Sequence, residues 1–282
     1  MYFTYIENEL NTYYNQIKHS KVKDIIKYSL EDGKCIRGFI VKHIMEINNC
    51  HYWEPIVAIE LIHGISLIID DLPCMDNDRE RRNKPSTFVK FGERQSILVS
   101  MYGIGEAFNL LYKSLKQTDN YNTNYIELLF NEWQENIGQN LIVGQMLDLK
   151  EDISKLLNIN IPNNNLNYHL NLMVYKTSAL FSFTFILGAI YSNINNIDDY
   201  KKMGYYFGIM FQIMDDFKDM DTDEKSANYV LMKGISESIQ LYLECKIKLL
   251  KLFEKYNIYT NKIEELIHLI DKHIPYNNGH HN

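Results

Sequence analysis

The chain has 282 residues, of which 46% are hydrophobic, and it carries a formal net charge of −7. This length suits one large domain or two modest ones, and the hydrophobic content is ample for a core. The acidic balance argues against a general nucleic-acid-binding protein. With 13 glycines and only 5 prolines, the composition favours long helices over a turn-rich β protein.

Neither targeting signals nor metal-binding cysteines are evident. The N-terminus carries acidic residues early and has no basic region followed by an apolar run, so we predict no signal peptide. The longest apolar run, near 179–191, is shorter than a membrane span, and we predict a buried helix rather than a transmembrane segment. The four cysteines show no Cys-x-x-Cys pair and no zinc spacing, which favours reduced cysteines in a cytoplasmic protein.

In chain order, helices are predicted at 3–17 and 20–31, before Gly33 breaks the pattern, and then from Ile36 to Ile47. Lys34 and Arg37 lie three residues apart at the start of this third helix, where a helix N-terminus already favours anions. Two basic side chains that reach out to solvent are the plain alternative. The acidic motifs that follow favour the anion site.

The next helix, predicted at 53–71, is apolar and carries His63 before it reaches Asp70 and Asp71. A histidine on such a helix is more often a packed core residue than a ligand. Because the residue before a proline avoids the α region, Pro73 ends this helix near Asp71 or Leu72. We therefore expect Asp76 to come from a turn that doubles back, followed by the neighbouring arginines, Arg81 and Arg82.

The rest of the chain also has a helical pattern, with no sustained period-two alternation. A second acidic cluster lies in FQIMDDFKD, where Asp215 and Asp219 are four residues apart and share a helix face with Gln212. An Asn-rich stretch at 158–167 is expected to be a linker. The other predicted helices are 94–116, 125–149, 167–191, 226–255 and 260–274.

Both acidic clusters end apolar helices, and carboxylates this close repel each other unless a cation neutralises them. Mg²⁺ binds proteins through one or two carboxylates per site and takes its other ligands from water and substrate phosphates. A solvated acidic face explains one cluster alone equally well. Two clusters, one with arginines beside it, favour a divalent metal held between them.

The stretch HGISLIIDDLPCMDNDRERRNKPSTFVKFGE resembles the first aspartate-rich region of trans-prenyl diphosphate synthases, the geranylgeranyl and farnesyl diphosphate synthase family. GIMFQIMDDFKD resembles their second region, and further motifs follow in the family's order over nearly the whole chain. The resemblance implies an all-α, single-domain isoprenoid synthase helical bundle around a central apolar cavity. That domain would span 1–274, with a polar tail at 275–282.

The resemblance also implies roles for individual residues, carried over position by position. The implied metal ligands are Asp70, Asp71, Asp76, Asp148, Asp215, Asp216 and Asp219. The residues implied to bind the two diphosphate substrates are Lys34, Arg37, His63, Arg81, Arg82, Gln145, Lys176, Thr177, Gln212 and Lys225. The residues implied to act directly in catalysis are Asp70, Asp71, Asp76, Arg81, Lys176, Asp215 and Lys225.

Four features depart from the family pattern. Cys35 stands where a second basic residue is common, Ile69 where many members have histidine, and Met101 where an aspartate is usual. The loop after Asp219 is short and lacks the first of two expected lysines.

The implied reaction is an Mg²⁺-dependent condensation of isopentenyl diphosphate with dimethylallyl, geranyl or farnesyl diphosphate. In this family, large aromatic residues four or five positions before the first aspartate shorten the product. Ile65 and Ser66 occupy these positions, so we predict geranylgeranyl diphosphate, with farnesyl diphosphate as the alternative. A homodimer is expected from the resemblance alone.

Two other functions are alternatives to this one. A class I terpene cyclase would not need Lys34, Arg37, His63 and Arg82 for a second diphosphate, and its second metal motif differs from DDFKD. A non-catalytic partner subunit gains support from Cys35, Met101 and the short loop, whereas the intact aspartates of both motifs favour an active enzyme.

Overall fold

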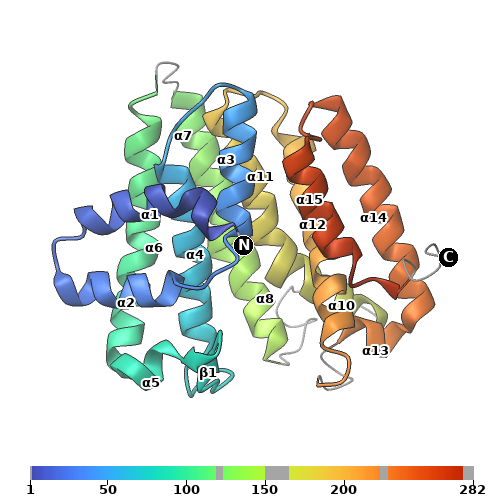
Figure 1. Ribbon diagram of the computed structural model, residues 1–282, viewed down its shortest axis with the longest axis horizontal. Coiled ribbons are helices and arrows are strands. Elements are labelled where there is room, and N and C mark those ends of the chain that lie inside the picture. Colours follow the sequence, from blue (N-terminus) through green and yellow to red (C-terminus); the bar gives the residue numbers. More distant parts are fainter. Residues whose placement is uncertain (1, 119–122, 150–164, 223–227, 276–282) are drawn as a thin grey trace. The chain divides into compact units, whose positions relative to one another are not determined.

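The structure is a computed structural model that describes residues 2–118, 123–149, 165–222 and 228–275. Within these ranges the secondary structure is helical apart from one short hairpin (Figure 1). The elements are α1 (Phe3–Gln16), α2 (Ser20–Leu30), α3 (Ile36–Ile47), α4 (Glu54–Asp70), β1 (Glu80–Arg81), β2 (Lys84–Pro85), α5 (Thr87–Phe91), α6 (Glu93–Leu115), α7 (Thr123–Trp133), η1 (Gln134–Asn140), α8 (Leu141–Asp148), α10 (Asn165–Leu172), η2 (Met173–Ser178), α11 (Ala179–Tyr191), α12 (Ile197–Lys218), α13 (Tyr229–Lys233), α14 (Ile235–Lys255) and α15 (Asn261–Asp271).

Local sequence signals explain several helix ends. α3 has the bounds that the sequence predicted, and α4 ends at Asp70, three residues before Pro73. The single helix predicted at 226–255 is wrong over its first part. Gly234 adopts φ +89° and separates α13 from α14, because a left-handed residue cannot continue a right-handed helix.

Two long predicted helices each contain a π-helical segment. The prediction at 125–149 corresponds to α7, η1 and α8, and the prediction at 167–191 corresponds to α10, η2 and α11. π-helical turns are rare and occur frequently at functional sites. η2 contains Lys176 and Thr177, two of the predicted substrate-binding residues.

The described chain forms two compact units. The first contains the residues up to Leu129 together with Leu187–Asn195, and the second contains Phe130–Ile186 together with the residues from Asn196 onward. In the first unit, α4 packs on α6 and on α3. In the second, η2 packs on α8 and on α12, and α12 also packs on α14. The prediction of one domain over 1–274 stays a prediction.

The apolar run that was predicted to form a buried helix is buried. Every residue of α11 is buried. The longer helix Tyr168–Tyr191 passes a length and hydropathy test for a membrane span, and 78% of its most apolar window is buried within the protein. Such burial is typical of a core helix.

Candidate active site

The turn after α4 gathers the first three predicted aspartates. The backbone N–H of Asp76 donates to the carbonyl oxygen of Asp70 at 2.9 Å, and that of Asn77 donates to Leu72 at 3.1 Å. Asn77 has φ +55°, a conformation that asparagine tolerates better than most residues. The chain therefore doubles back as predicted, and Asp76 returns to the end of α4 beside Asp70 and Asp71.

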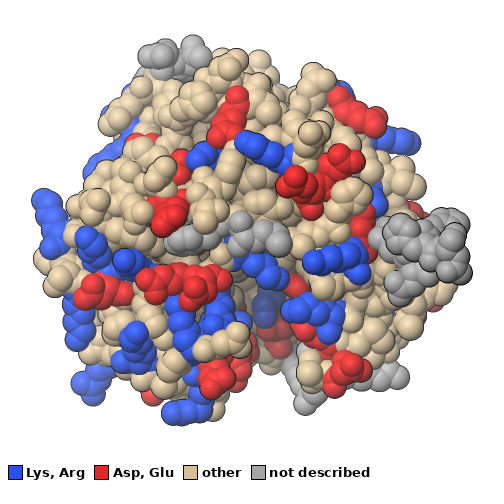
Figure 2. All heavy atoms as spheres, in the orientation of Figure 1, with Lys and Arg blue, Asp and Glu red and all other residues tan. Residues whose placement is uncertain are grey.

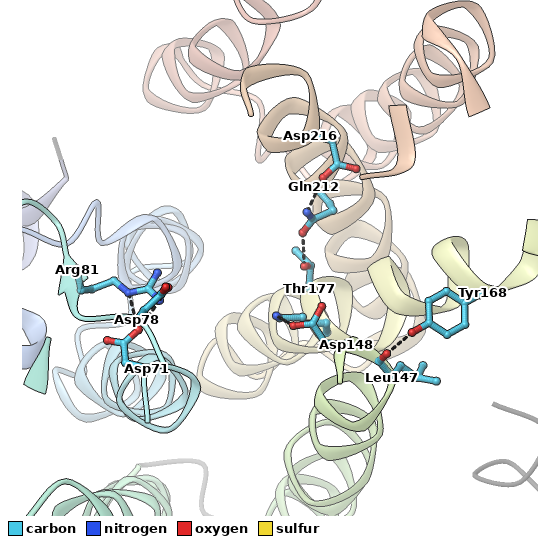
Figure 3. Close-up of polar contacts among 10 residues, drawn as sticks. Asp71, Asp78, Arg81, Leu147, Asp148, Tyr168, Thr177, Gln212 and Asp216 are labelled. Carbon is cyan, nitrogen blue, oxygen red and sulfur yellow. Dashed lines mark hydrogen bonds and ion pairs between the residues drawn. The ribbon is translucent and has the colours of Figure 1, made fainter. Parts of the chain in front are cut away.

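Arg81 binds the buried member of this group (Figure 3). Its Nε donates to Oδ1 of Asp71 at 2.9 Å, and its Nη2 contacts the same oxygen. Nη2 also donates to Oδ2 of Asp78 at 3.1 Å. Burial raises the pKa of Asp71, which is 2% exposed, while the Arg81 guanidinium acts in the opposite direction.

Arg82 turns to a different part of the first unit. Its φ of +57° lies in the left-handed region, and its Nη1 donates to the carbonyl oxygens of Ser29 at 3.0 Å and Glu31 at 2.8 Å. These oxygens are at the C-terminal end of α2, where a cation is favoured by the helix dipole. Both Nη atoms also lie 3.3 Å from the position of a Cβ built on Gly33.

A second basic cluster therefore forms around the start of α3. Arg82 lies against the Gly33 turn that precedes Lys34, and Arg37 is only 9% exposed. Burial lowers the pKa of His63 well below its usual value, and the nearby charges of Arg37, Arg82 and Arg81 lower it further. The structure thus brings Arg37, His63 and Arg82 together, with Lys34 exposed at the edge.

This cluster contains a carboxylate that the sequence analysis missed. Glu60 on α4 is 4% exposed, and its Oε1 accepts a hydrogen bond from the backbone N–H of Gly38 at 2.7 Å. The signal was present in IELIHG, where one acidic residue interrupts an apolar run three positions before His63.

In the second unit, α8 places Asp148 against Lys176. The Lys176 ammonium forms an ion pair with Oδ2 of Asp148. The close approach depends on Gly144, because a Cβ there would lie 2.4 Å from the backbone nitrogen of Lys176. Gln145, which was predicted to bind substrate, is half-buried beside this crossing.

A chain of hydrogen bonds links η2, α12 and α13, and Figure 3 shows the part of it that runs from Thr177 through Gln212 to Asp216. Thr177 Oγ1 donates to Gln212 Oε1 at 2.6 Å, and Gln212 Nε2 donates to Asp216 Oδ1 at 2.8 Å. Asp216 Oδ2 accepts from the backbone N–H of Tyr229 at 2.8 Å. Both carboxylate oxygens of Asp216 are therefore engaged within the protein, and the residue is 4% exposed.

The role of Asp216 as a metal ligand stays a prediction. In the structure its carboxylate fastens the start of α13 to α12. The neighbouring Asp215 is half-buried in the last turn of α12, and Asp219 follows the end of the helix, with its N–H bonded to the Asp215 carbonyl at 2.9 Å. Lys225 lies outside the described residues.

A cavity of about 90 Å³ opens beside Lys176 in the second unit. Its polar lining includes several of the predicted substrate residues and also His169, which the sequence analysis did not single out. Burial lowers the pKa of His169, as does the charge of Lys233. The cavity is lined by Asp148, His169, Leu172, Met173, Lys176, Thr177, Gln212 and Tyr229.

The two residues expected to limit product length differ in their surroundings. Ile65 is 1% exposed and packs against α6, where its Cδ1 lies 2.5 Å from a Cβ built on Gly103. Ser66 is half-buried, and its hydroxyl donates to the carbonyl oxygen of His63 at 2.8 Å. Of the two positions, Ser66 is the more exposed.

Charged side chains of both signs are interspersed over the face shown in Figure 2. Among the described residues, no group of three or more His, Cys, Asp or Glu side chains is gathered in a way that would hold a metal ion by itself. The four cysteines are all free thiols.

Solved structures identify the class of protein to which this arrangement belongs. A geranyltranstransferase from Thermotoga maritima superposes with a TM-score of 0.79 at 24% identity, over 95% of this chain and 97% of that one. A geranyltransferase from Helicobacter pylori, solved with magnesium and isoprenyl diphosphate, superposes with a TM-score of 0.72 at 23% identity, over 96% of this chain and 97% of that one. The protein has the all-α isoprenoid synthase fold.

Sequence comparison assigns the protein to a family within this fold. The family described as polyprenyl synthetase matches residues 19–245, and the chain belongs to that family. A farnesyl diphosphate synthase from Micrococcus luteus is 30% identical over 83% of this chain and 82% of its own length. The large subunit 1 of a heterodimeric geranylgeranyl pyrophosphate synthase from Arabidopsis thaliana is 30% identical over 73% of this chain and 56% of its own length.

Proposed function

We propose that the protein is a trans-prenyltransferase that condenses isopentenyl diphosphate with an allylic diphosphate. One observation within the first unit carries this proposal. Arg81 and Arg82 are adjacent in sequence but diverge, Arg81 toward the aspartates after α4 and Arg82 toward the cluster around the start of α3. Two arginines with different protein partners suit a reaction with two diphosphate substrates, whereas a terpene cyclase binds only one.

The donor set fits Mg²⁺. The candidate ligands Asp70, Asp71, Asp76, Asp215 and Asp219 offer hard carboxylate oxygens, which Mg²⁺ prefers. Mg²⁺ usually keeps several waters and takes other ligands from substrate phosphates, so a complete cage of protein ligands is not expected. Bound metal would supply charge stabilisation for the diphosphate leaving group.

The chain's own cations contribute to the same step. The C1–O bond of the allylic diphosphate breaks, and its electron pair leaves with the diphosphate. Within the first unit, Arg81 would stabilise this growing negative charge, since fixed cations in a water-poor site act more strongly than in bulk water. Asp71 holds Arg81 in place before substrate arrives, and within the second unit Asp148 pairs with Lys176.

The second substrate would be held at the cluster around α3. Arg37, Arg82 and His63, with Lys34 at the edge, would bind the diphosphate of isopentenyl diphosphate and orient its double bond toward the allylic C1. The new C–C bond forms as this double bond attacks, and loss of a proton restores a double bond in the product. We propose that the departed diphosphate accepts this proton.

We further propose geranylgeranyl diphosphate as the main product. Ser66 supports this, because the position that would carry a blocking aromatic ring has only a small side chain. Farnesyl diphosphate is the alternative, and relatives with each activity are about equally similar. A cytoplasmic location stays a prediction.

The deciding experiment incubates purified protein with Mg²⁺, isopentenyl diphosphate and each allylic diphosphate in turn, then sizes the product. We expect a C20 product that disappears with EDTA and in an Asp70→Asn variant. A cyclised hydrocarbon from an allylic diphosphate alone would support a cyclase. No turnover alongside intact substrate binding would support a non-catalytic partner subunit.

We also propose a homodimer. Apolar side chains are exposed along α6, with Leu98 at 65%, Met101 at 69% and Ile97 at 46% exposure. Their spacing places them close together on the helix surface, and such patches commonly mark protein interfaces. Light scattering should give the mass of a dimer for the wild type and that of a monomer for Met101→Glu; a monomeric wild type would contradict the proposal.

A further inference from the structure

The residue that precedes α3 does not cap this helix, and Glu60 of α4 supplies the capping carboxylate. The residue preceding α3 is Cys35, in a left-handed conformation with φ +52°, and it makes no side-chain capping bond. Gly38 is the third residue of α3, so its N–H has no partner within the helix. Glu60 reaches across from α4 and accepts this N–H at 2.7 Å, placing an acidic group where the helix dipole favours it.

The same carboxylate lies among the cations of the proposed isopentenyl diphosphate site. Burial raises the pKa of Glu60, while the Gly38 N–H and the charges of Arg37 and Arg82 counteract that rise. His63 follows three residues later on the same face of α4. Burying a carboxylate in this position is costly unless it is paired and hydrogen-bonded. The position of Glu60 near two arginines therefore needs a physical explanation.

We propose that Glu60 is a positioning residue for isopentenyl diphosphate, which holds Arg37, Arg82 and the start of α3 in the arrangement that receives the diphosphate. This inference rests on the proposed function. Two guanidinium groups in a buried site repel each other before the anion arrives. The nearby charge of Glu60, which both arginines influence, counters that repulsion and so lowers the reorganisation that binding requires.

The test compares variants that separate the charge of Glu60 from its capping bond. Glu60→Gln keeps an acceptor for the Gly38 N–H but removes the charge, and Glu60→Asp keeps the charge on a shorter side chain. Glu54→Gln is the matched control, because Glu54 lies on the first turn of the same helix and burial also raises its pKa. Calorimetry with isopentenyl diphosphate alone measures binding without turnover, since no allylic partner is present.

We expect Glu60→Gln to weaken binding about ten-fold, the size of one charge-assisted hydrogen bond, with Glu60→Asp in between and Glu54→Gln unchanged. In steady-state assays, the KM for isopentenyl diphosphate should rise while the KM for the allylic diphosphate stays constant. Thermal unfolding checks that each variant is folded. If Glu60→Gln does not fold, Glu60→Asp provides the test. A raised KM for isopentenyl diphosphate with a constant KM for the allylic diphosphate would then support the inference, and unchanged KM values would overturn it.

Other outcomes overturn the inference. Unchanged binding in Glu60→Gln would mean that Glu60 only caps α3. Tighter binding would mean that its charge competes with the substrate. Either result, with normal binding by the wild type, leaves the proposed function intact, whereas a wild type that does not bind isopentenyl diphosphate contradicts both.

Discussion

The guanidinium of Arg81 holds one oxygen of Asp71 from two nitrogens and reaches Asp78 with one of them. This fork fixes the direction of the arginine, which a single contact would not. Lysine carries the same charge but has no planar fork. Replacing Arg81 by lysine therefore keeps the positive charge and removes the fork, so that the effect of geometry on activity can be measured separately from that of charge.

Replacing Arg81 by lysine should lower kcat about 10²-fold, the usual cost of misplacing one group that stabilises transition-state charge. The melting temperature should change little, since Arg81 is half-exposed. Arg79→Lys, at an exposed position of the same loop, is the control and should behave as wild type. Steady-state kinetics of both variants would show this; kcat for Arg81→Lys within two-fold of wild type would contradict it.

Gly144→Ala should separate α8 from η2, because the added Cβ would lie 2.4 Å from the Lys176 backbone nitrogen. Overpacking of this kind costs about 1–3 kcal/mol, and the Asp148–Lys176 pair should weaken with it. We expect a lower melting temperature and weaker binding of inorganic diphosphate in the presence of Mg²⁺. Gly105→Ala on α6, where a Cβ has nothing within 4 Å, should be neutral or stabilising.

Ser66→Phe should shorten the product, because an aromatic ring one turn before Asp70 would fill space that the growing chain needs. A helical turn rises about 5.4 Å, roughly one isoprene unit. Chromatography of the products should show a shift from C20 toward C15, whereas Ser66→Ala should leave the product unchanged. An identical product distribution in the Phe variant would refute Ser66 as a floor residue.

Glu60 should also give the protein a measurable pH dependence of stability. Its folded-state pKa is raised above the ordinary value of 4.5, so the folded state binds this proton more tightly than the unfolded state. The resulting stability is fully present below the ordinary pKa and is lost as pH rises through the folded-state pKa. The free energy of unfolding of wild type relative to Glu60→Gln should therefore fall as pH rises.

Urea unfolding of both proteins at several pH values above 4.5 measures this difference. The nearby Arg37, Arg82 and His63 are common to both proteins, so their own contributions largely cancel. Parallel stability curves would contradict the expectation. Glu60→Gln could be more stable than wild type at neutral pH and still bind isopentenyl diphosphate less well. That result would show that Glu60 lowers the stability of the protein in favour of substrate binding.

The sequence predicted those parts of the fold that depend on local chemistry. Pro73 restricts its own neighbours, so the end of α4 and the return of Asp76 could be read directly. The π-helical segments could not, because nothing in η1 or η2 taken alone distinguishes them from α-helix. The Gly144 crossing shows that packing between helices, and not local propensity, decides the position of Lys176 relative to α8.

In the candidate site, too, the sequence predicted some features and the structure was needed for others. Motif spacing singled out Arg81 and Arg82 together, and the hairpin and the φ of Arg82 show how these adjacent residues turn to different partners. The resemblance placed Asp216 among the metal ligands, and only the structure shows that its carboxylate also binds Gln212 and the backbone of Tyr229. Glu60 was missed because its partners lie on another helix.

The attachment of α13 to Asp216 uses the backbone N–H of Tyr229 and not its ring. Any residue except proline could make that bond. Tyr229 also lines the cavity beside Lys176. Position 229 can therefore accept new side chains that reshape the cavity while α13 stays attached, which makes it a natural starting point for evolving or engineering altered substrate preference.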